Sequence, residues 1–466
     1  MNLASQILFM IFRLIARFRL PRLGAHLLVL TLRPVTMPDG KEGSRKKRYR
    51  ALVMRRTGFL EDVEQSFLAA DDFEGIGWYS GALKAFASEI LSPSLDHNNY
   101  ISSDPKIEAT KMRYRRFLSD LWQHFVSIKP IDVVLTGNFA YFTERELAIV
   151  LEQAGTPFIA LHKENVRPPR RVREYWFTLY KDRRGKFGGR RILVYNEIER
   201  ELEISAGVID VDRVSVTGMP RLDRLHRWRL EHVRRGSNNE KPRVLFFAFA
   251  RSDKLTAIQR KTFAGIPGDM EEMAGEWGKM SWGKFCIDTH KAIVEVAREN
   301  PDFEVIVKSK GQKRKLNDIL QMLSEMRDGL PPNLKIVASG DPFDLIASSR
   351  VVIGFNTTGL LEAIATGKPV IVPRFAEASD SAMQDLIIDL GAAVDYADST
   401  DGLKAMISRY VRNPEKPPAQ LSEESRDALR YWVGNDDGLA GQRVTEILRA
   451  EIESTRSGRL RRTKDL

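Results

Sequence analysis

The chain has 466 residues, of which 43% are apolar and 29% are charged. These values are typical of a globular protein, and the length predicts two or three domains. The single cysteine, Cys286, excludes an intrachain disulfide framework and a cysteine-rich zinc module, and we expect it to be a small buried apolar side chain. The formal charge of +11 favours anionic partners: nucleic acid, an acidic membrane surface or phosphorylated substrates.

Residues 1–34 are mostly apolar but contain Arg13, Arg17, Arg19 and Arg22. Their longest uncharged run is far shorter than the roughly 20 residues that a bilayer span needs. The charges follow the apolar stretch, which is not the pattern of a signal peptide. Because Arg13 and Arg17 share one helix face, the segment suits a helix lying in the headgroup region of an anionic leaflet. The alternative is a core helix whose arginines extend to solvent.

The segment that follows has the pattern of an α/β domain. A strand is expected at 51–56, a helix from Glu61, and a long amphipathic helix over 106–127. Then come strand, helix and strand in the order of a βαβ unit, and a further repetition of the same order. These later elements are expected at 130–138, 143–155, 156–165, 192–196, 197–207 and 213–220.

A second α/β series follows the charged, turn-rich stretch 232–242, which is the best candidate for a domain boundary. Apolar runs typical of central parallel strands alternate with helical patterns, and 402–454 is mostly helical. The strands are expected at 243–250, 303–310, 334–339, 351–355 and 370–373, and the helices at 286–300, 314–329 and 342–349.

The two series predict an α/β protein with two Rossmann-like domains facing a cleft. Ligands bind outside the carboxyl ends of the strands in such sheets. The predicted boundaries are 1–45 for a basic amphipathic N-terminal segment, 46–235 and 241–415 for the two domains, and 416–466 for C-terminal helices with a basic tail.

A polar interruption separates two apolar strands in 351-VVIGFNTTGLLEAIATGKPVIVPRF-375. Asn356, Thr357 and Thr358 follow the first strand, and Gly359 allows the backbone to pass close to a ligand. The first-turn amides of the helix that follows are unpaired donors at its positive end, where a phosphate can bind.

Glu362 lies three positions after Gly359. Its carboxylate can cap the helix by accepting hydrogen bonds from first-turn amides. Alternatively, its two oxygens can accept hydrogen bonds from the vicinal hydroxyls of a nucleotide ribose. The local sequence leaves both roles open.

This order of strand, polar residues, Gly, Glu-Ala and a Gly-Lys-Pro-Val return resembles the donor-binding signature of GT-B glycosyltransferases. The similarity is to bacterial capsule and surface-polysaccharide enzymes and to CDP-glycerol glycerophosphotransferases. The segment 217-TGMPRLDRL-225 resembles the motif that closes their first domain, and 244-VLFFAFAR-251 resembles the strand that begins the second. The resemblance covers about residues 130–395. It implies that 46–235 binds the acceptor and 241–415 the nucleotide donor.

The resemblance also assigns residues to the donor site. It implies that Glu362 holds the ribose, that Thr357 to Gly359 meet the diphosphate, and that Arg251 reaches the donor. Where many relatives have Lys-Pro-His-Pro, this chain has 308-KSKGQKRK-315, so the duty of that histidine does not transfer. Lys308 and Lys310 can neutralise a pyrophosphate; the alternative is a solvated basic turn.

Three residues are candidates for catalysis. His162 and Glu164 follow the strand 157–161 and are expected to point into the cleft, and Glu61 takes the corresponding place after the first strand. A transfer with inversion needs a base near the acceptor hydroxyl, and a carboxylate or histidine can serve. The alternatives are a structural loop histidine and a carboxylate at a helix start.

The sequence shows no Asp-x-Asp metal motif of the GT-A type, no HExxH and no P-loop, so we expect neither a metal site nor a resident cofactor. The co-substrate would be a nucleotide-activated sugar. No zinc-finger, RNA-recognition or KH motif accompanies the basic segments, which argues against a nucleic-acid partner.

The predicted function is a metal-independent glycosyltransferase or glycerophosphotransferase with a surface-glycan or lipid-linked acceptor, as in capsule or lipopolysaccharide synthesis. We expect it in the bacterial cytoplasm, peripheral on the inner face of the membrane. One alternative is a sugar-nucleotide 2-epimerase of the same fold, although 373-PRFAEASD-380 lacks the Thr-Glu-Arg-Pro-Glu run typical of those enzymes. Another is a non-catalytic basic scaffold that binds a membrane surface or nucleic acid.

Overall fold

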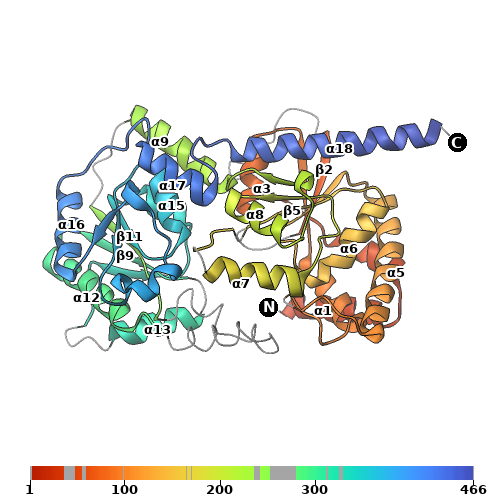
Figure 1. Cartoon of the computed structure of the whole chain (residues 1–466), viewed down its shortest axis with the longest axis horizontal. Helices are drawn as coiled ribbons and strands as arrows, with labels where there is room; N and C mark the ends of the chain where they lie inside the picture. The colour runs from red at the N-terminus through yellow and green to blue at the C-terminus, as the bar shows by residue number, and fades with distance from the viewer. Residues whose placement is uncertain are drawn as a thin grey trace. The chain divides into compact units, whose positions relative to one another are not determined.

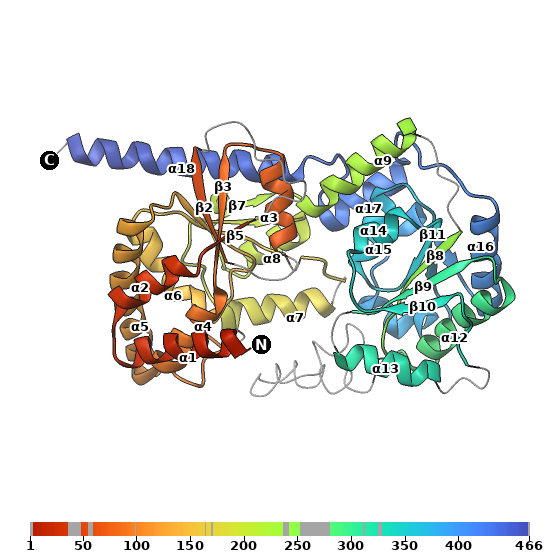
Figure 2. The same cartoon turned by 180° about the vertical axis from the view of Figure 1, so that it is seen from behind.

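The structure is a computed structural model (Figures 1 and 2). It describes residues 3–35, 48–54, 59–97, 99–163, 165–168, 171–235, 242–251, 280–310, 313–324 and 329–464. The chain forms two compact units. Unit 1 comprises Met1–Asn165, Trp176–Asp223 and Val433–Leu466, and unit 2 comprises Val166–Tyr175 and Arg224–Trp432.

Unit 1 is built on a seven-stranded sheet in the order β1-β3-β2-β4-β5-β6-β7. All neighbouring strands are parallel except β1, which pairs antiparallel with β3. The strands are β1 (Arg33–Pro34), β2 (Tyr49–Met54), β3 (Phe73–Trp78), β4 (Val133–Thr136), β5 (Phe158–Leu161), β6 (Arg191–Val194) and β7 (Val214–Val216). Strands β4 and β5 are apolar almost throughout because both faces of the sheet are covered.

Helices cover both faces of this sheet (Figures 1 and 2). On β2, Leu52 and Met54 face one apolar core while Ala51 and Val53 face the other, as the alternation of a strand requires. The first core includes residues of α1 (Leu3–Arg17), α2 (Pro21–Leu30), α4 (Ser80–Ile90), α5 (Pro105–Ile128), α6 (Phe142–Gln153) and α8 (Glu197–Ser205). The second includes residues of α3 (Phe59–Leu68) and the last helix, α18 (Ala440–Lys464).

Unit 2 contains a six-stranded, fully parallel sheet in the order β10-β9-β8-β11-β12-β13. Its strands are β8 (Arg243–Phe247), β9 (Glu304–Lys308), β10 (Leu334–Val337), β11 (Val351–Gly354), β12 (Val370–Pro373) and β13 (Asp395–Ala397). In chain order this is 3-2-1-4-5-6, the doubly wound arrangement of Rossmann folds. Two Rossmann-like units thus confirm the predicted α/β fold class, including the N-terminal amphipathic helix and the C-terminal helices.

The helices of unit 2 follow its strands, except for the helix at residues 223–235, which precedes the first strand and was not predicted. They are α9 (Asp223–Arg235), α12 (Gly283–Glu299), α13 (Lys313–Ser324), α14 (Pro342–Ala347), α15 (Thr358–Ala365), α16 (Thr400–Arg412) and α17 (Glu423–Val433). Helix α7 (Arg171–Leu179) runs from unit 2 into unit 1. Among the described helices, none has the length and hydropathy that crossing a membrane requires.

Candidate functional site

The strand order of unit 2 reverses between β8 and β11, which is where ligands bind in doubly wound sheets. Phe247, the last residue of β8, pairs with Lys308 of β9 on one side and with Gly354 of β11 on the other. The segments that leave these three strands therefore start side by side at the carboxyl edge. This edge contains the predicted donor-binding residues.

Asn356 positions the loop after β11. Its backbone φ is 48°, in the left-handed region that asparagine tolerates better than most residues. The side chain is buried, donates to the carbonyl of Leu386 at 2.8 Å, and accepts from the amide of Ile388 at 2.8 Å. Both ends of the amide are therefore used to hold the segment around residue 387, which favours a positioning role for Asn356 over direct contact with a ligand.

The polar residues after Asn356 begin helix α15. Thr357 is its N-cap, and its hydroxyl accepts from the amide of Gly359 at 3.4 Å. Thr357 and Thr358 are partly exposed, whereas Gly359 is buried against β8. A Cβ atom on Gly359 would lie 2.8 Å from the ring of Phe247. Glycine is thus needed here because the helix N-terminus packs directly on the last residue of the central strand.

The cap of α15 clarifies the role of Glu362. With Thr357 as N-cap, the position from which a glutamate reaches back in a capping box is occupied by Leu360. Glu362 lies two residues further along the helix and is partly exposed. The capping-box role is therefore excluded, and its use toward a ligand stays a prediction.

The three basic donor candidates differ in their surroundings. Lys308 donates to the carbonyls of Ser309 at 3.0 Å and Ala338 at 2.9 Å, and its partial burial lowers the pKa of its ammonium. Lys310 and Arg251 are exposed. Lys308 thus stabilises the ends of β9 and β10, and the other two are better placed to meet an anion.

A cavity of about 260 Å³ lies beside the segment after β8. Arg251 is the predicted donor-binding residue among its described lining residues, and Asp318 of α13 carries the opposite charge. The described lining consists of Phe249, Ala250, Arg251, Cys286, Asp318, Ile319, Gln321 and Met322. Cys286 is buried, as predicted, with its Sγ 3.2 Å from the carbonyl oxygen of Phe249.

An aromatic cluster under this edge was not predicted. The ring of Phe355, directly after β11, lies 4.9 Å from Trp282, 4.8 Å from Phe285 and 5.3 Å from Phe249 between centroids. The cluster joins the segments after β8 and β11 to the start of α12. The available signal was the aromatic residues near the ends of the two predicted apolar strands, 243–250 and 351–355.

The N-terminus of α12 already holds a carboxylate of the chain. Glu377 accepts from the amides of Lys284 at 2.8 Å and Phe285 at 2.7 Å. Because a carboxylate of the chain already occupies these first-turn donors, they are not available to a phosphate.

In unit 1, His162 is fully buried and does not extend toward solvent as expected for a cleft residue. Its Nδ1 lies 2.8 Å from Glu203 and its Nε2 lies 3.2 Å from the side-chain amide of Asn138. The strand end places the residue as predicted, but α8 covers it: Glu199 and Glu203, one turn apart, both face its ring. Their spacing in the sequence was a usable signal.

His162, Glu199 and Glu203 are also a group that could hold a metal ion, since their ligand atoms lie within 4.8 Å of one another. The three side chains already engage in hydrogen bonds: Nδ1 of His162 contacts Glu203, and the hydroxyl of Tyr180 donates to Glu199 at 2.6 Å. We therefore interpret the group as a buried hydrogen-bonded network that fixes α8 against β5.

Glu61 is exposed in the first turn of α3, whereas Glu164 lies outside the described residues. The strand order of unit 1 reverses between β2 and β4, and α3 follows β2. Glu61 is therefore close in sequence to the carboxyl edge where a ligand of unit 1 is expected.

The next residue, Asp62, is buried and makes a structural link. It accepts from Arg221 at 3.0 Å and from the hydroxyl of Tyr195 at 2.6 Å. Arg221 belongs to the segment 217–225 that resembles the domain-closing motif. In that same segment Asp223 accepts from the amide of Gly441 at 2.7 Å, at the start of α18.

No protein-family model matches the chain, and no curated protein matches it. Solved structures similar to it include UDP-GlcNAc 2-epimerase from Neisseria meningitidis bound to UDP-GlcNAc. Its sequence identity is 14%, the match covers 86% of this chain and 100% of that chain, and the TM-score is 0.44. Anabaena HepE in complex with UDP and glucose has 14% identity, coverage of 86% and 100%, and a TM-score of 0.42. The wall teichoic acid polymerase TagF has 10% identity, coverage of 97% and 99%, and a TM-score of 0.47. At these values the similarities assign no function to this chain.

Proposed function

We propose that the protein is a metal-independent GT-B glycosyltransferase that uses a nucleotide-activated sugar. The observation that carries the proposal is the start of α15. Its N-terminus packs through Gly359 onto Phe247 at the point where the strand order of unit 2 reverses. Backbone donors at the positive end of a helix are suited to a diphosphate, and this is the edge where doubly wound sheets bind ligands.

In this proposal Thr357, Thr358 and the first-turn amides of α15 bind the diphosphate, and Arg251 and Lys310 add positive charge. Glu362 accepts hydrogen bonds from the two ribose hydroxyls. As the bond between the sugar and the diphosphate breaks, negative charge grows on the leaving phosphate oxygen. Donors that are already oriented stabilise that charge without reorganisation, so the leaving group needs no metal ion.

We propose Glu61 as the base that accepts the proton of the acceptor hydroxyl while its oxygen attacks the anomeric carbon. Glu61 is exposed at the start of α3, whereas His162 is enclosed by Glu203 and Asn138. His162 then acts as a positioning residue that holds Asn138 directly after β4. The acceptor is a surface glycan or a lipid-linked sugar, and the enzyme works in the cytoplasm on the inner face of the membrane.

The donor assignment is tested by thermal shift with CDP-, UDP- and GDP-sugars, which identifies the nucleotide base that stabilises the protein. Glu362→Gln should weaken the binding of that nucleotide about 10-fold or more. A carboxylate that accepts hydrogen bonds from two hydroxyls contributes roughly 1.5–3 kcal/mol to the binding free energy. Glu415→Gln, an exposed change in unit 2, is the matched control and should leave the affinity unchanged. Unchanged affinity in Glu362→Gln contradicts the ribose assignment.

The chemistry is tested with the same donor and a glycan acceptor. Glu61→Gln should lower kcat by about 10²–10⁴-fold without changing nucleotide affinity, as loss of a general base does. Isomerisation of the donor sugar without any acceptor would instead establish the epimerase. If none of the nucleotides raised the melting temperature, the protein would be the non-catalytic basic scaffold.

A further inference from the structure

Helix α1 has apolar residues on two faces. Phe12, Ile15 and Ala16 are buried in the core of unit 1. A second set, spaced three or four residues apart, shares another face of the helix and is exposed. It consists of Leu3 at 73%, Ile7 and Met10 at 53%, Ile11 at 41%, Leu14 at 48% and, just past the helix, Phe18 at 66% exposure. A contiguous apolar surface of this kind marks a binding site for a partner or a membrane.

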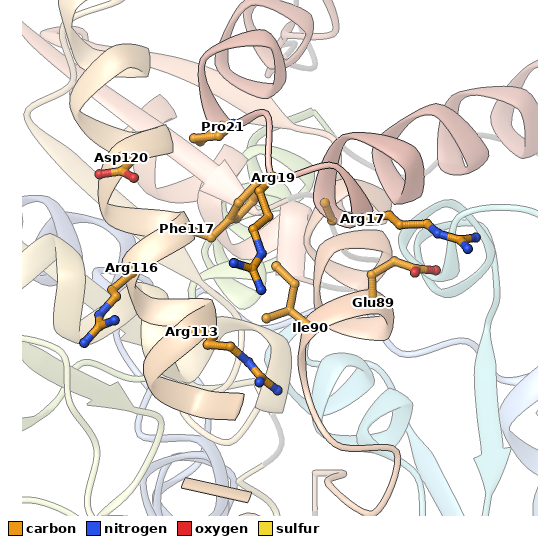
Figure 3. Close-up of a pocket in the computed structure, with 10 residues that line it drawn as sticks. Arg17, Arg19, Pro21, Glu89, Ile90, Arg113, Arg116, Phe117 and Asp120 are labelled. Atoms are coloured by element: carbon orange, nitrogen blue, oxygen red, sulfur yellow. The ribbon is translucent and has the colours of Figure 1, made fainter. Parts of the chain in front are cut away.

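A cavity of about 490 Å³ lies at the turn between α1 and α2 (Figure 3). Its lining consists of Ala16, Arg17, Arg19, Pro21, Glu89, Ile90, Arg113, Arg116, Phe117 and Asp120. Figure 3 shows Arg19 extending between Phe117 and Ile90 toward Arg113, with Arg17 and Arg116 on either side. Arg17 ends α1, Arg19 lies in the turn after it, and Arg113 and Arg116 belong to α5; all four are exposed.

The charge of this cavity is unbalanced. One of its two acidic residues, Glu89, is engaged by Arg13 outside the cavity. Within the described part of the chain, no ion pair or hydrogen bond engages the guanidinium groups of Arg17, Arg19, Arg113 or Arg116. Four cations therefore line a concave site with Asp120 as the remaining carboxylate, and Arg17 and Arg116 point outward at its two sides (Figure 3).

The backbone at Arg19 supports a binding role. Its φ is 54°, the left-handed conformation that follows a helix and that glycine usually supplies. The amide of Leu20 donates to the carbonyl of Ile15 at 3.0 Å, as in such a helix end. An arginine is unfavourable at this position for the fold, and its guanidinium extends into the cavity.

We propose that α1 and this cavity form a binding surface for an anionic phospholipid bilayer. The exposed apolar face enters the interface beside the headgroups, and the arginines bind the phosphate of one phospholipid, since guanidinium and phosphate pair through two parallel hydrogen bonds. A second copy of the chain fits less well, because a twofold contact would bring the same four arginines of each copy together. The inference extends the membrane location proposed above and does not depend on the donor site.

The test is sedimentation of the full chain with vesicles of phosphatidylcholine alone or mixed with phosphatidylglycerol, without nucleotide. We expect binding to the anionic vesicles that falls with added salt. Arg19→Glu/Arg113→Glu should weaken it about 25-fold or more, given about fivefold, the equivalent of about 1 kcal/mol, for each cation near the surface. The exposed triple change Ile7→Ser/Leu14→Ser/Phe18→Ser should also weaken it.

Lys291→Glu/Lys416→Glu is the matched control, with two exposed cations of unit 2 reversed, and should bind within twofold of the natural chain. Unchanged melting temperatures show that the variants are folded. Equal binding to both vesicles, or equal loss in the control, would overturn the proposal. The proposal would also be overturned if the chain bound no vesicles and instead sedimented as a dimer that the triple change dissociates. Because no donor is present, this outcome and that of the nucleotide test are independent.

Discussion

The close packing of α15 on β8 leads to a prediction about Gly359→Ala. The added carbon would lie 2.8 Å from two atoms of the Phe247 ring and 3.1 Å from a third. Carbon atoms in contact prefer separations of roughly 3.5–4.0 Å, so the ring or the helix must move by several tenths of an ångström. Overpacking of this kind costs about 1–3 kcal/mol, and the higher helix propensity of alanine offsets up to about 1 kcal/mol.

We therefore expect the free energy of unfolding of unit 2 to fall by about 1–2 kcal/mol. The matched control is Gly458→Ala in α18, where an added Cβ meets no atom within 4 Å. That change should raise stability by about 0.5–1 kcal/mol, because alanine replaces glycine in a helix without a clash. Urea unfolding followed by tryptophan fluorescence measures both changes.

Phe247, whose ring the added carbon would contact, supplies a second control. Phe247→Leu should lower stability alone, but it should reduce the additional cost of Gly359→Ala by about 1–2 kcal/mol in a double-mutant cycle. Gly359→Ala should also weaken nucleotide binding while removing no polar group, since it displaces the α15 amides. Additivity of the two changes, or a stability of Gly359→Ala equal to that of the natural chain, would refute the packing argument.

Two further predictions concern buried ionisable groups. Burial lowers the pKa of His290 to about 4, below the unfolded value of about 6.5. As the pH drops, the unfolded state therefore binds the proton at a higher pH than the folded state does. The free energy of unfolding should fall by about 3 kcal/mol between pH 6.5 and pH 4. His290→Gln should flatten that dependence in urea unfolding, whereas the same change at exposed His26 should not. Asp62→Asn should destabilise unit 1 by about 3–5 kcal/mol, because it leaves Arg221 without its buried carboxylate partner. The double change Asp62→Leu/Arg221→Met should lose less stability than the single change. A single change that costs less stability than the double change would contradict the role of the ion pair.

The strands and the start of α15 could be predicted because their signals are local. The apolar run 243–250 gave β8 at Arg243–Phe247, and 351–355 gave β11 at Val351–Gly354. The polar residues 356–358 and Gly359, between two apolar runs, predicted the turn into α15. Each of these signals acts within a few neighbouring residues.

The partners of the side chains could not be predicted in the same way. Asn356 belongs to the predicted phosphate-binding segment, but its hydrogen bonds go to Leu386 and Ile388, thirty residues away. His162 follows its strand as expected, yet its exposure depends on α8, which lies more than thirty residues later in the chain. A strand end predicts the edge on which a residue lies; the helix packed there decides whether its side chain reaches a ligand.

In the segment 217–225, which resembles a domain-closing motif, tertiary contacts explain which residue types are present. The chain leaves unit 1 after Asp223 and returns at Val433, and the amide of Met219 donates to the carbonyl of Val433 at 2.9 Å. A Cβ on Gly218 would lie 2.4 Å from the carbonyl oxygen of Gly434, and both glycines have positive φ. The outgoing and returning segments thus cross in backbone contact, which side chains would prevent.

The polar residues of the same segment fasten that crossing to unit 1. Arg221 pairs with Asp62 at the start of α3, and Asp223 accepts from the amide of Gly441 at the start of α18. Each residue type is required by its contact: glycine by the crossing, arginine by a buried carboxylate, and aspartate by the unpaired amides of a helix N-terminus. The motif is therefore explained by the insertion of unit 2 into unit 1, and it needs no contact with substrate.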